Sequence, residues 1–199
     1  MLWQKKIDNE YGIKVLDEYD YPALKRYCTE CNLEGMVNNS SFDKLNISSI
    51  HGDSGQYLCT YHISSGTIVN VCATQHLPIQ LDCWGKDKVY ECYRIGVRNG
   101  TLKDWRQEFV KGLSWIPNLS LNHIYPIQIR WALMKGAKKI IVTTNNKGVD
   151  SSGKMFKVDK IMSILAKKKC FYHIASDINI FGASQNVWEL NMEYWKNKI

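Results

Sequence analysis

Hydrophobic and polar positions change their spacing several times along the chain, and each spacing predicts a different kind of element. Residues 56–63 and 67–74 are rich in β-branched and aromatic residues, and the Ser-Ser-Gly loop between them predicts a hairpin. A third such stretch follows at residues 88–97, so we expect an antiparallel meander. Residues 139–144 are nearly all apolar, which is typical of a strand covered on both faces. We therefore expect this strand at the centre of a sheet.

Helical spacing of apolar residues appears in the segments around these strands. Near the N-terminus, Leu24, Tyr27, Cys28 and Cys31 fall on one face of a helix that begins at Tyr21. The predicted apolar faces of two later helices consist of Ile124, Ile127, Trp131, Leu133 and Met134 within residues 121–137, and of Met155, Val158, Ile161, Met162 and Leu165. The prediction is completed by a short helix at residues 42–47, a short strand at 13–16, and two closing strands at 170–176 and 186–194.

This order of elements predicts an α+β fold with a mixed, mostly antiparallel sheet flanked by helices. The length of 199 residues favours one domain. We expect a helical N-terminal section at residues 1–55, the antiparallel meander at 56–97, and a C-terminal α/β half at 98–199.

The composition is that of an ordinary globular protein, with 45% hydrophobic and 23% charged residues. No run of 18 uncharged apolar residues occurs, so we expect a soluble protein. The N-terminus has no apolar stretch of the kind that a secretory signal needs, and we expect a cytoplasmic location. The seven cysteines are accordingly expected as reduced thiols.

Positive charge is concentrated in the last two thirds of the chain. Residues 1–60 carry 6 Lys and Arg against 9 Asp and Glu, whereas residues 61–199 carry 20 against 10. A positive electrostatic field attracts phosphates, whether of a nucleic acid or of a phosphate-bearing cofactor. A well-solvated surface without such a ligand can carry the same excess of Lys and Arg. Nucleic acid is therefore one possible partner of this part of the chain.

The order of elements resembles the GNAT superfamily of acyl-coenzyme A dependent acyltransferases, over nearly the whole chain. Four segments are more closely similar to small GNAT-like proteins of bacteriophages, namely residues 92–98 (CYRIGVR), 125–129 (YPIQI), 143–145 (TTN) and 185–188 (QNVW). The resemblance implies an acyl-CoA N-acyltransferase fold. It also implies an acyl-coenzyme A donor such as acetyl-CoA, and no metal.

In the family, the donor's pantetheine arm lies where the fourth strand separates from the fifth. By position, residues 88–97 resemble the fourth strand and residues 139–144 the fifth. A glycine near the end of a strand also suits close approach by a ligand, although it can simply end the strand. On this resemblance we assign donor binding to Ile95, Gly96, Val97, Arg98, Ser120 and Asn145.

Two features depart from the family pattern. The usual phosphate-binding loop has two glycines, but only Gly100 follows the fourth strand here. Arg98, Lys103 and Arg106 can pair with phosphates in its place, or can belong to a solvated loop. The helix after the fifth strand offers Phe156 where the family commonly has a proton-donating tyrosine.

Acyl transfer to an amine needs a base, a polarised thioester carbonyl, and a proton donor for the leaving thiolate. Glu91 is the candidate base, since the resemblance implies a strand carboxylate. Alternation places Tyr93 on the same face of the strand, and leaves open whether this face meets the cleft. Tyr125 is the third catalytic candidate. His123 lies beside it, where a histidine commonly caps or packs.

The motifs of several other enzyme classes do not occur in the sequence, including those of P-loop hydrolases, α/β-hydrolases and zincins. The Cys28-Thr29-Glu30-Cys31 motif has no second half elsewhere, so its thiols are expected to pack on a helix. The sequence thus favours an acyltransferase that modifies an amine. The alternative is a non-catalytic GNAT-like module that binds nucleic acid or a protein, and a third possibility is acylation of a base in phage DNA.

Overall fold

The computed structural model describes the residues that form most of the expected elements. They are residues 4–20, 22–24, 26–27, 55–85, 89–90, 92–95, 98–101, 119–145, 148–149, 155–156, 162, 165–180 and 183–199. The chain divides into two compact units, Met1–Thr74 with Gly96–Ile124 and Gln75–Ile95 with Tyr125–Ile199. We describe each unit by itself, and the expected single domain stays a prediction.

Unit 1 is built on antiparallel strands in the order β1-β2-β3-β4. Their bounds are Gln4–Lys6, Tyr11–Val15, Gly55–His62 and Ile68–His76, and β4 continues past Thr74 into unit 2. A further strand, β8 (Arg98–Thr101), pairs with β4. These strands confirm the predicted hairpin, whose turn is closed by the His62 N–H, which donates to the Thr67 carbonyl at 2.9 Å. Gly66 makes this turn possible because its φ is +67°.

The core of unit 1 joins the N-terminal helical residues to the strands. It consists of Leu16, Leu24, Tyr27, Cys59, Ile68 and Val71. Leu24 and Tyr27 lie on the predicted helical face and are buried, while Cys28, Cys31 and the helix at 42–47 lie outside the described residues.

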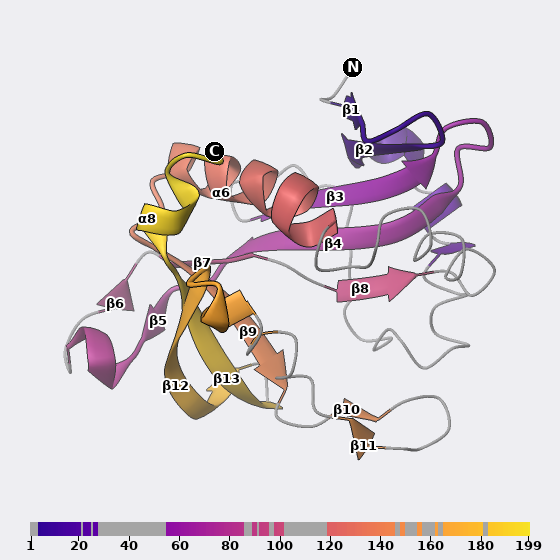
Figure 1. Ribbon diagram of the computed structural model, residues 1–199. Helices are drawn as coiled ribbons and strands as arrows, with labels where there is room; N and C mark the ends of the chain where they lie inside the picture. Colours follow the sequence, from indigo (N-terminus) through magenta and orange to yellow (C-terminus); the bar gives the residue numbers. More distant parts are fainter. Residues whose placement is uncertain are drawn as a thin grey trace. The chain divides into compact units, whose positions relative to one another are not determined.

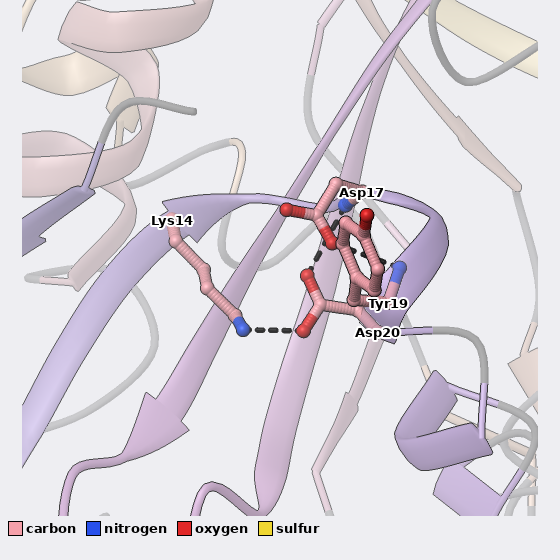
Figure 2. Close-up of polar contacts among 4 residues, drawn as sticks. All are labelled: Lys14, Asp17, Tyr19 and Asp20. Atoms are coloured by element: carbon pink, nitrogen blue, oxygen red, sulfur yellow. Dashed lines mark hydrogen bonds and ion pairs between the residues drawn. The ribbon is translucent and has the colours of Figure 1, made fainter. Parts of the chain in front are cut away.

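A half-buried ion pair fastens β2 to the short 3-10 helix η1 (Glu18–Asp20) that follows it. The Lys14 ammonium donates to Asp20, whose second carboxylate oxygen accepts from the Asp17 N–H at 3.1 Å (Figure 2). The Asp17 carboxylate in turn accepts from the Tyr19 N–H at 3.0 Å. Burial alone would lower the pKa of Lys14, but the Asp20 hydrogen bond and neighbouring carboxylates raise it. The pair therefore keeps its charge in the folded chain.

Unit 2 has a mixed sheet in the strand order β7-β9-β13-β12. The bounds are Cys92–Arg94, Lys139–Asn145, Ala183–Leu190 and Phe171–Ile180, and β12 and β13 lie side by side as a twisted hairpin (Figure 1). The β7–β9 pair is parallel, while β9–β13, β13–β12 and the contact of β7 with the end of β4 are antiparallel. This confirms the mixed, mostly antiparallel sheet and the central place of the apolar strand.

Smaller elements of unit 2 bear on three predictions, of which two are corrected. Residues 89–90 and 92–94 of the predicted strand 88–97 are extended, as β6 (Val89–Tyr90) and β7, and they pair in one antiparallel register with β5 (Ile79–Gln80) and the end of β4. The 3-10 helix η2 (Asp82–Trp84) lies between β5 and β6. Met155 and Phe156 form β11, which pairs with β10 (Gly148–Val149) instead of beginning a helix. The last predicted strand ends early, because the Asn191 side chain caps helix α8 (Met192–Trp195) by accepting from the Glu193 N–H.

The predicted face of the helix over 121–137 is wrong in part. The segment begins as a π-helical turn, η3 (Ser120–Ile124), and continues as α6 (Tyr125–Met134). A π turn holds more residues than an α turn, so it shifts every later residue around the axis. The buried residues of α6 are Tyr125, Gln128, Ile129 and Ala132, whereas Leu133 and Met134 are 39% and 78% exposed.

No helix in the described part of the chain has the length and apolar character needed to span a bilayer.

We predict that Asp20→Ala lowers the free energy of unfolding by about 2 kcal/mol, because it leaves the half-buried Lys14 ammonium without its charged acceptor. Chemical denaturation measures the loss. Glu10→Ala removes an exposed carboxylate from the same unit and is the matched control, expected within about 0.5 kcal/mol of the unmodified chain. Equal effects of the two changes would contradict the role given to the ion pair.

Candidate active site at the end of the parallel strand pair

The ladder between the two strands that the sequence analysis singled out is short. Its register is Cys92↔Lys139, Tyr93↔Ile140 and Arg94↔Ile141, followed by one hydrogen bond from the Ile95 N–H to the Ile141 carbonyl at 2.8 Å. Beyond it, β9 runs on to Asn145 in register with β13. The pairing of the two strands is thus described as far as Ile95, and their separation beyond it stays a prediction. Gly96 and Val97, at which the slot would open, lie outside the described residues.

The carboxyl end of β9 is polar, in contrast to its apolar beginning. Ile140, Ile141 and Val142 are buried, and two threonines and an asparagine follow. The Thr144 hydroxyl accepts from the Trp188 indole N–H at 3.1 Å. The Thr143 hydroxyl oxygen is buried and has no hydrogen-bond partner among the described residues. Since buried polar groups are normally paired, this oxygen marks a place for a ligand or water.

The neighbouring strand β13 widens this polar region. Gln185 lies opposite Asn145 and Asn186 lies opposite Thr144 in the register, and both are largely buried. The Gln185 amide donates to the Ile180 carbonyl at 3.3 Å. Ligands of sheets with parallel strands bind beyond the carboxyl ends of those strands. The carboxyl ends of β7 and β9 are accordingly the candidate site.

Tyr93 lies on the face of β7 that is covered by α6. It is 5% exposed, and its ring packs against His76 at 5.0 Å and Trp131 at 5.7 Å between ring centroids. Its hydroxyl donates to the Lys135 carbonyl at a long 3.5 Å. Glu91, which the sequence analysis expects on the same face, lies outside the described residues.

Tyr125 is held elsewhere on the sheet. Its ring contacts Phe171 at 5.6 Å and Trp195 at 6.1 Å, so the start of α6 lies over the start of β12. In the order β7-β9-β13-β12, strands are about 4.8 Å apart, which places Tyr125 roughly 14 Å across the sheet from β7. The hydroxyls of Tyr93 and Tyr125 are therefore too far apart to reach one carbonyl together.

The predicted donor-binding residues are described to different extents. Ile95 is fully buried, and its N–H is already engaged by Ile141. Arg98 is the first residue of β8 and pairs with Val71 of β4. Ser120 begins η3, and Asn145 ends β9. The side chains of these last three residues lie outside the described part of the structure.

His123, in the π-helical turn of unit 1, carries a second unpaired polar atom. Its Nδ1 is buried and has no hydrogen-bond partner among the described residues. Burial lowers the pKa of His123, the charge of Lys5 lowers it further, and Asp8 opposes both. The ring is therefore neutral at pH 7.

The beginning of β9 carries an ion pair with a structural role. Glu189 accepts from the Lys139 ammonium at 2.6 Å and from the Trp84 indole N–H at 2.8 Å, so both of its oxygens are engaged. This ties η2 to the sheet beside Cys92. Burial raises the pKa of the Cys92 thiol to about 12, Glu189 adds to the shift, and Lys139 opposes it.

Within the described ranges, no group of three or more His, Cys, Asp or Glu side chains is placed to hold a metal ion. No family model matches the sequence, and no curated protein matches it.

Solved structures do match the fold over nearly the whole chain. A ribosomal-protein-S5-alanine acetyltransferase from Vibrio fischeri has a TM-score of 0.58 at 9% identity, over 95% of this chain and 96% of that one. The fold is that of the GNAT acyltransferases. An N-acyl amino acid synthase from uncultured soil microbes, FeeM, also has a TM-score of 0.58, at 12% identity over 94% and 93% of the two chains. A ribosomal L7/L12 α-N-protein acetyltransferase, RimL, in complex with coenzyme A scores 0.53 at 9% identity over 94% and 97%.

The sequence analysis did not single out Thr143, whose buried hydroxyl is the clearest polar feature of the site. The available signal was the change from apolar residues to Thr-Thr-Asn at the end of a central strand. That change was interpreted through Asn145 alone.

We predict that a maleimide modifies Cys83 in the native chain and leaves Cys59, Cys72, Cys92 and Cys170 unmodified until the chain unfolds. Cys83 is exposed and the other four are buried, and burial raises the pKa of both Cys72 and Cys92 to about 12. Peptide mass spectrometry after short labelling measures the pattern, with Cys83→Ser as the control. Rapid native labelling of Cys92 would contradict its place in the core of unit 2.

Proposed function

We propose that this protein is an acyltransferase that moves an acyl group from an acyl-coenzyme A to an amine. The observation that carries the proposal is the polar carboxyl end of β9, where the buried Thr143 hydroxyl has no hydrogen-bond partner among the residues that the structure describes. The GNAT fold supports it, because this strand pair corresponds by position to the family's fourth and fifth strands.

The donor's pantetheine arm carries amide and hydroxyl groups, which need hydrogen-bond partners when buried. In this proposal the Thr143 hydroxyl and Asn145 meet these groups from β9. The backbone of Ile95, Gly96 and Val97 meets them from the other side. Arg98 and the start of η3 at Ser120 bind the donor's phosphates, since a guanidinium and free N–H groups both suit phosphate.

In the reaction, the amine attacks the thioester carbonyl, a C–N bond forms and the C–S bond breaks. Glu91 takes the proton from the amine. The coenzyme A thiolate leaves and is protonated by a tyrosine, for which Tyr93 and Tyr125 are the candidates. Placing Glu91 and Tyr93 on one face of β7 keeps base and proton donor on the same strand.

For the acceptor we propose the amine of an amino acid or of a protein N-terminus. The similar proteins are described as acetyltransferases of ribosomal proteins and as an N-acyl amino acid synthase. The acyl group is acetyl or longer. We place the reaction in the cytoplasm. If the protein comes from a bacteriophage, this is the cytoplasm of the host cell.

We predict that acetyl-CoA or a longer acyl-CoA binds the chain, and that Thr143→Val weakens this binding about tenfold by removing one hydrogen bond. Isothermal titration measures both effects. Thr60→Val is the matched control, because Thr60 also has a buried hydroxyl without a described partner, but lies in β3 of unit 1. Neither change should lower stability, since each removes an unpaired polar group.

Absence of binding for acyl-CoA of every chain length would overturn the proposal and favour the non-catalytic module. If Thr143→Val and Thr60→Val bound the donor equally well, Thr143 would not be part of the donor site. That result would leave the proposed acyl transfer standing.

We predict that Tyr93→Phe lowers kcat about a hundredfold or more, because it removes the proton donor nearest the β7–β9 ladder. Tyr125→Phe should leave kcat within about twofold, since Tyr125 packs over β12, roughly 14 Å across the sheet from β7. The release of coenzyme A thiol with an amino acid as acceptor measures both rates. The reverse order of effects would assign the donor to Tyr125.

A further inference from the structure

Lysines from three separate parts of the sequence come together at one end of the sheet of unit 2. This basic end consists of Lys135, Lys138, Lys139, Lys167, Lys168, Lys169, Lys196 and Lys198. β9 begins at Lys139, while β12 begins at Phe171, directly after three of these lysines. Helix α8, which follows β13, precedes the last two.

The strand registers place these three segments side by side. Glu189 lies opposite Ile141, and Phe171 lies opposite Leu190, so the start of β9, the end of β13 and the start of β12 share one end of the sheet. Hydrogen bonds tie the segments together. The Asn191 side chain donates to the Lys169 carbonyl at 2.6 Å, and the Trp195 indole donates to the Cys170 carbonyl at 3.0 Å.

Acidic groups neutralise little of this charge. Glu189 pairs with Lys139, and Glu193 pairs with Lys196. Asp82 belongs to η2, which is held to the sheet by the hydrogen bond from the Trp84 indole to Glu189. At this end of the described sheet, eight lysines thus face Asp82, Glu189 and Glu193, while Asp177 lies near the far end of β12. Lys138, Lys167, Lys168 and Lys169 are exposed and have no acidic partner among the described residues.

Aromatic rings accompany the lysines. Tyr172 is 51% exposed and lies opposite Glu189 in the register. The Lys198 ammonium lies 4.3 Å from the centre of the Tyr194 ring. Lysine ammonium groups on flexible stems suit the phosphates of a nucleic-acid backbone, and exposed rings suit stacking with bases.

We propose that the basic end of unit 2 binds the phosphate backbone of nucleic acid without sequence preference. Three strands at about 4.8 Å spacing span roughly 10 Å, which is enough to meet more than one phosphate. The surface lies at the opposite end of β9 from residues 143–145, to which the pantetheine arm is assigned. The inference does not rest on the acyltransferase proposal.

Fluorescence anisotropy with labelled single-stranded DNA, single-stranded RNA and duplex DNA of about 20 nucleotides tests the proposal, between about 50 and about 200 mM salt. We expect binding that weakens steadily with salt. The double variant Lys167→Gln/Lys168→Gln should lower the slope of log K against log salt by roughly 1.4 to 1.8, the value for two phosphate contacts.

The matched control is Lys5→Gln/Lys6→Gln, which removes the same charge from the exposed strand β1 of unit 1. It should leave the slope unchanged. Equal losses in the two variants would show attraction by net charge alone and overturn the proposal. So would the absence of binding at the lowest salt, or binding to phosphatidylserine vesicles with none to nucleic acid. Acetyl-CoA titrations of the same variants should match the unmodified chain, and this readout separates the two proposals.

Discussion

Strand β9 is the constraint on which unit 2 depends. A strand with apolar residues on both faces can be buried only if its backbone groups are paired along both edges. β13 supplies this pairing along one edge through Asn145. β7 supplies it along the other edge through Ile141. The end of β9 beyond this point carries polar side chains, which agrees with a strand whose surroundings change part-way along its length.

The polar residues of the candidate site and the lysines of the basic end are thereby separated along one strand, β9. The polar residues, with the Thr143 hydroxyl that has no partner in the described part of the chain, lie at the carboxyl end of β9, and the lysines lie at its amino end. The partly buried ion pair at the amino end, through Glu189, has a structural role, because both carboxylate oxygens of Glu189 are engaged. The candidate site and the basic end therefore lie at opposite ends of β9.

The fold was largely predictable because it depends on local patterns. The hairpin at residues 56–74 and the apolar strand at 139–144 are visible in residue type alone, and the order of elements points to the GNAT fold. The short strand at residues 79–80, which pairs with residues 89–90, was not predicted, because two residues give no periodicity that marks a strand. The Trp188–Thr144 hydrogen bond and the distance between Tyr93 and Tyr125 depend on tertiary packing, which no spacing encodes.

The π-helical turn ahead of α6 has a consequence for comparing this chain with others. Deleting one residue from Ser120–Ile124 would rotate the later side chains by about 100° about the helix axis. Gln128 and Ile129 would leave the interior, and surface positions would take their place. An ungapped alignment with a chain that has a regular helix here pairs core with surface, so homologues must be aligned by structure across this turn.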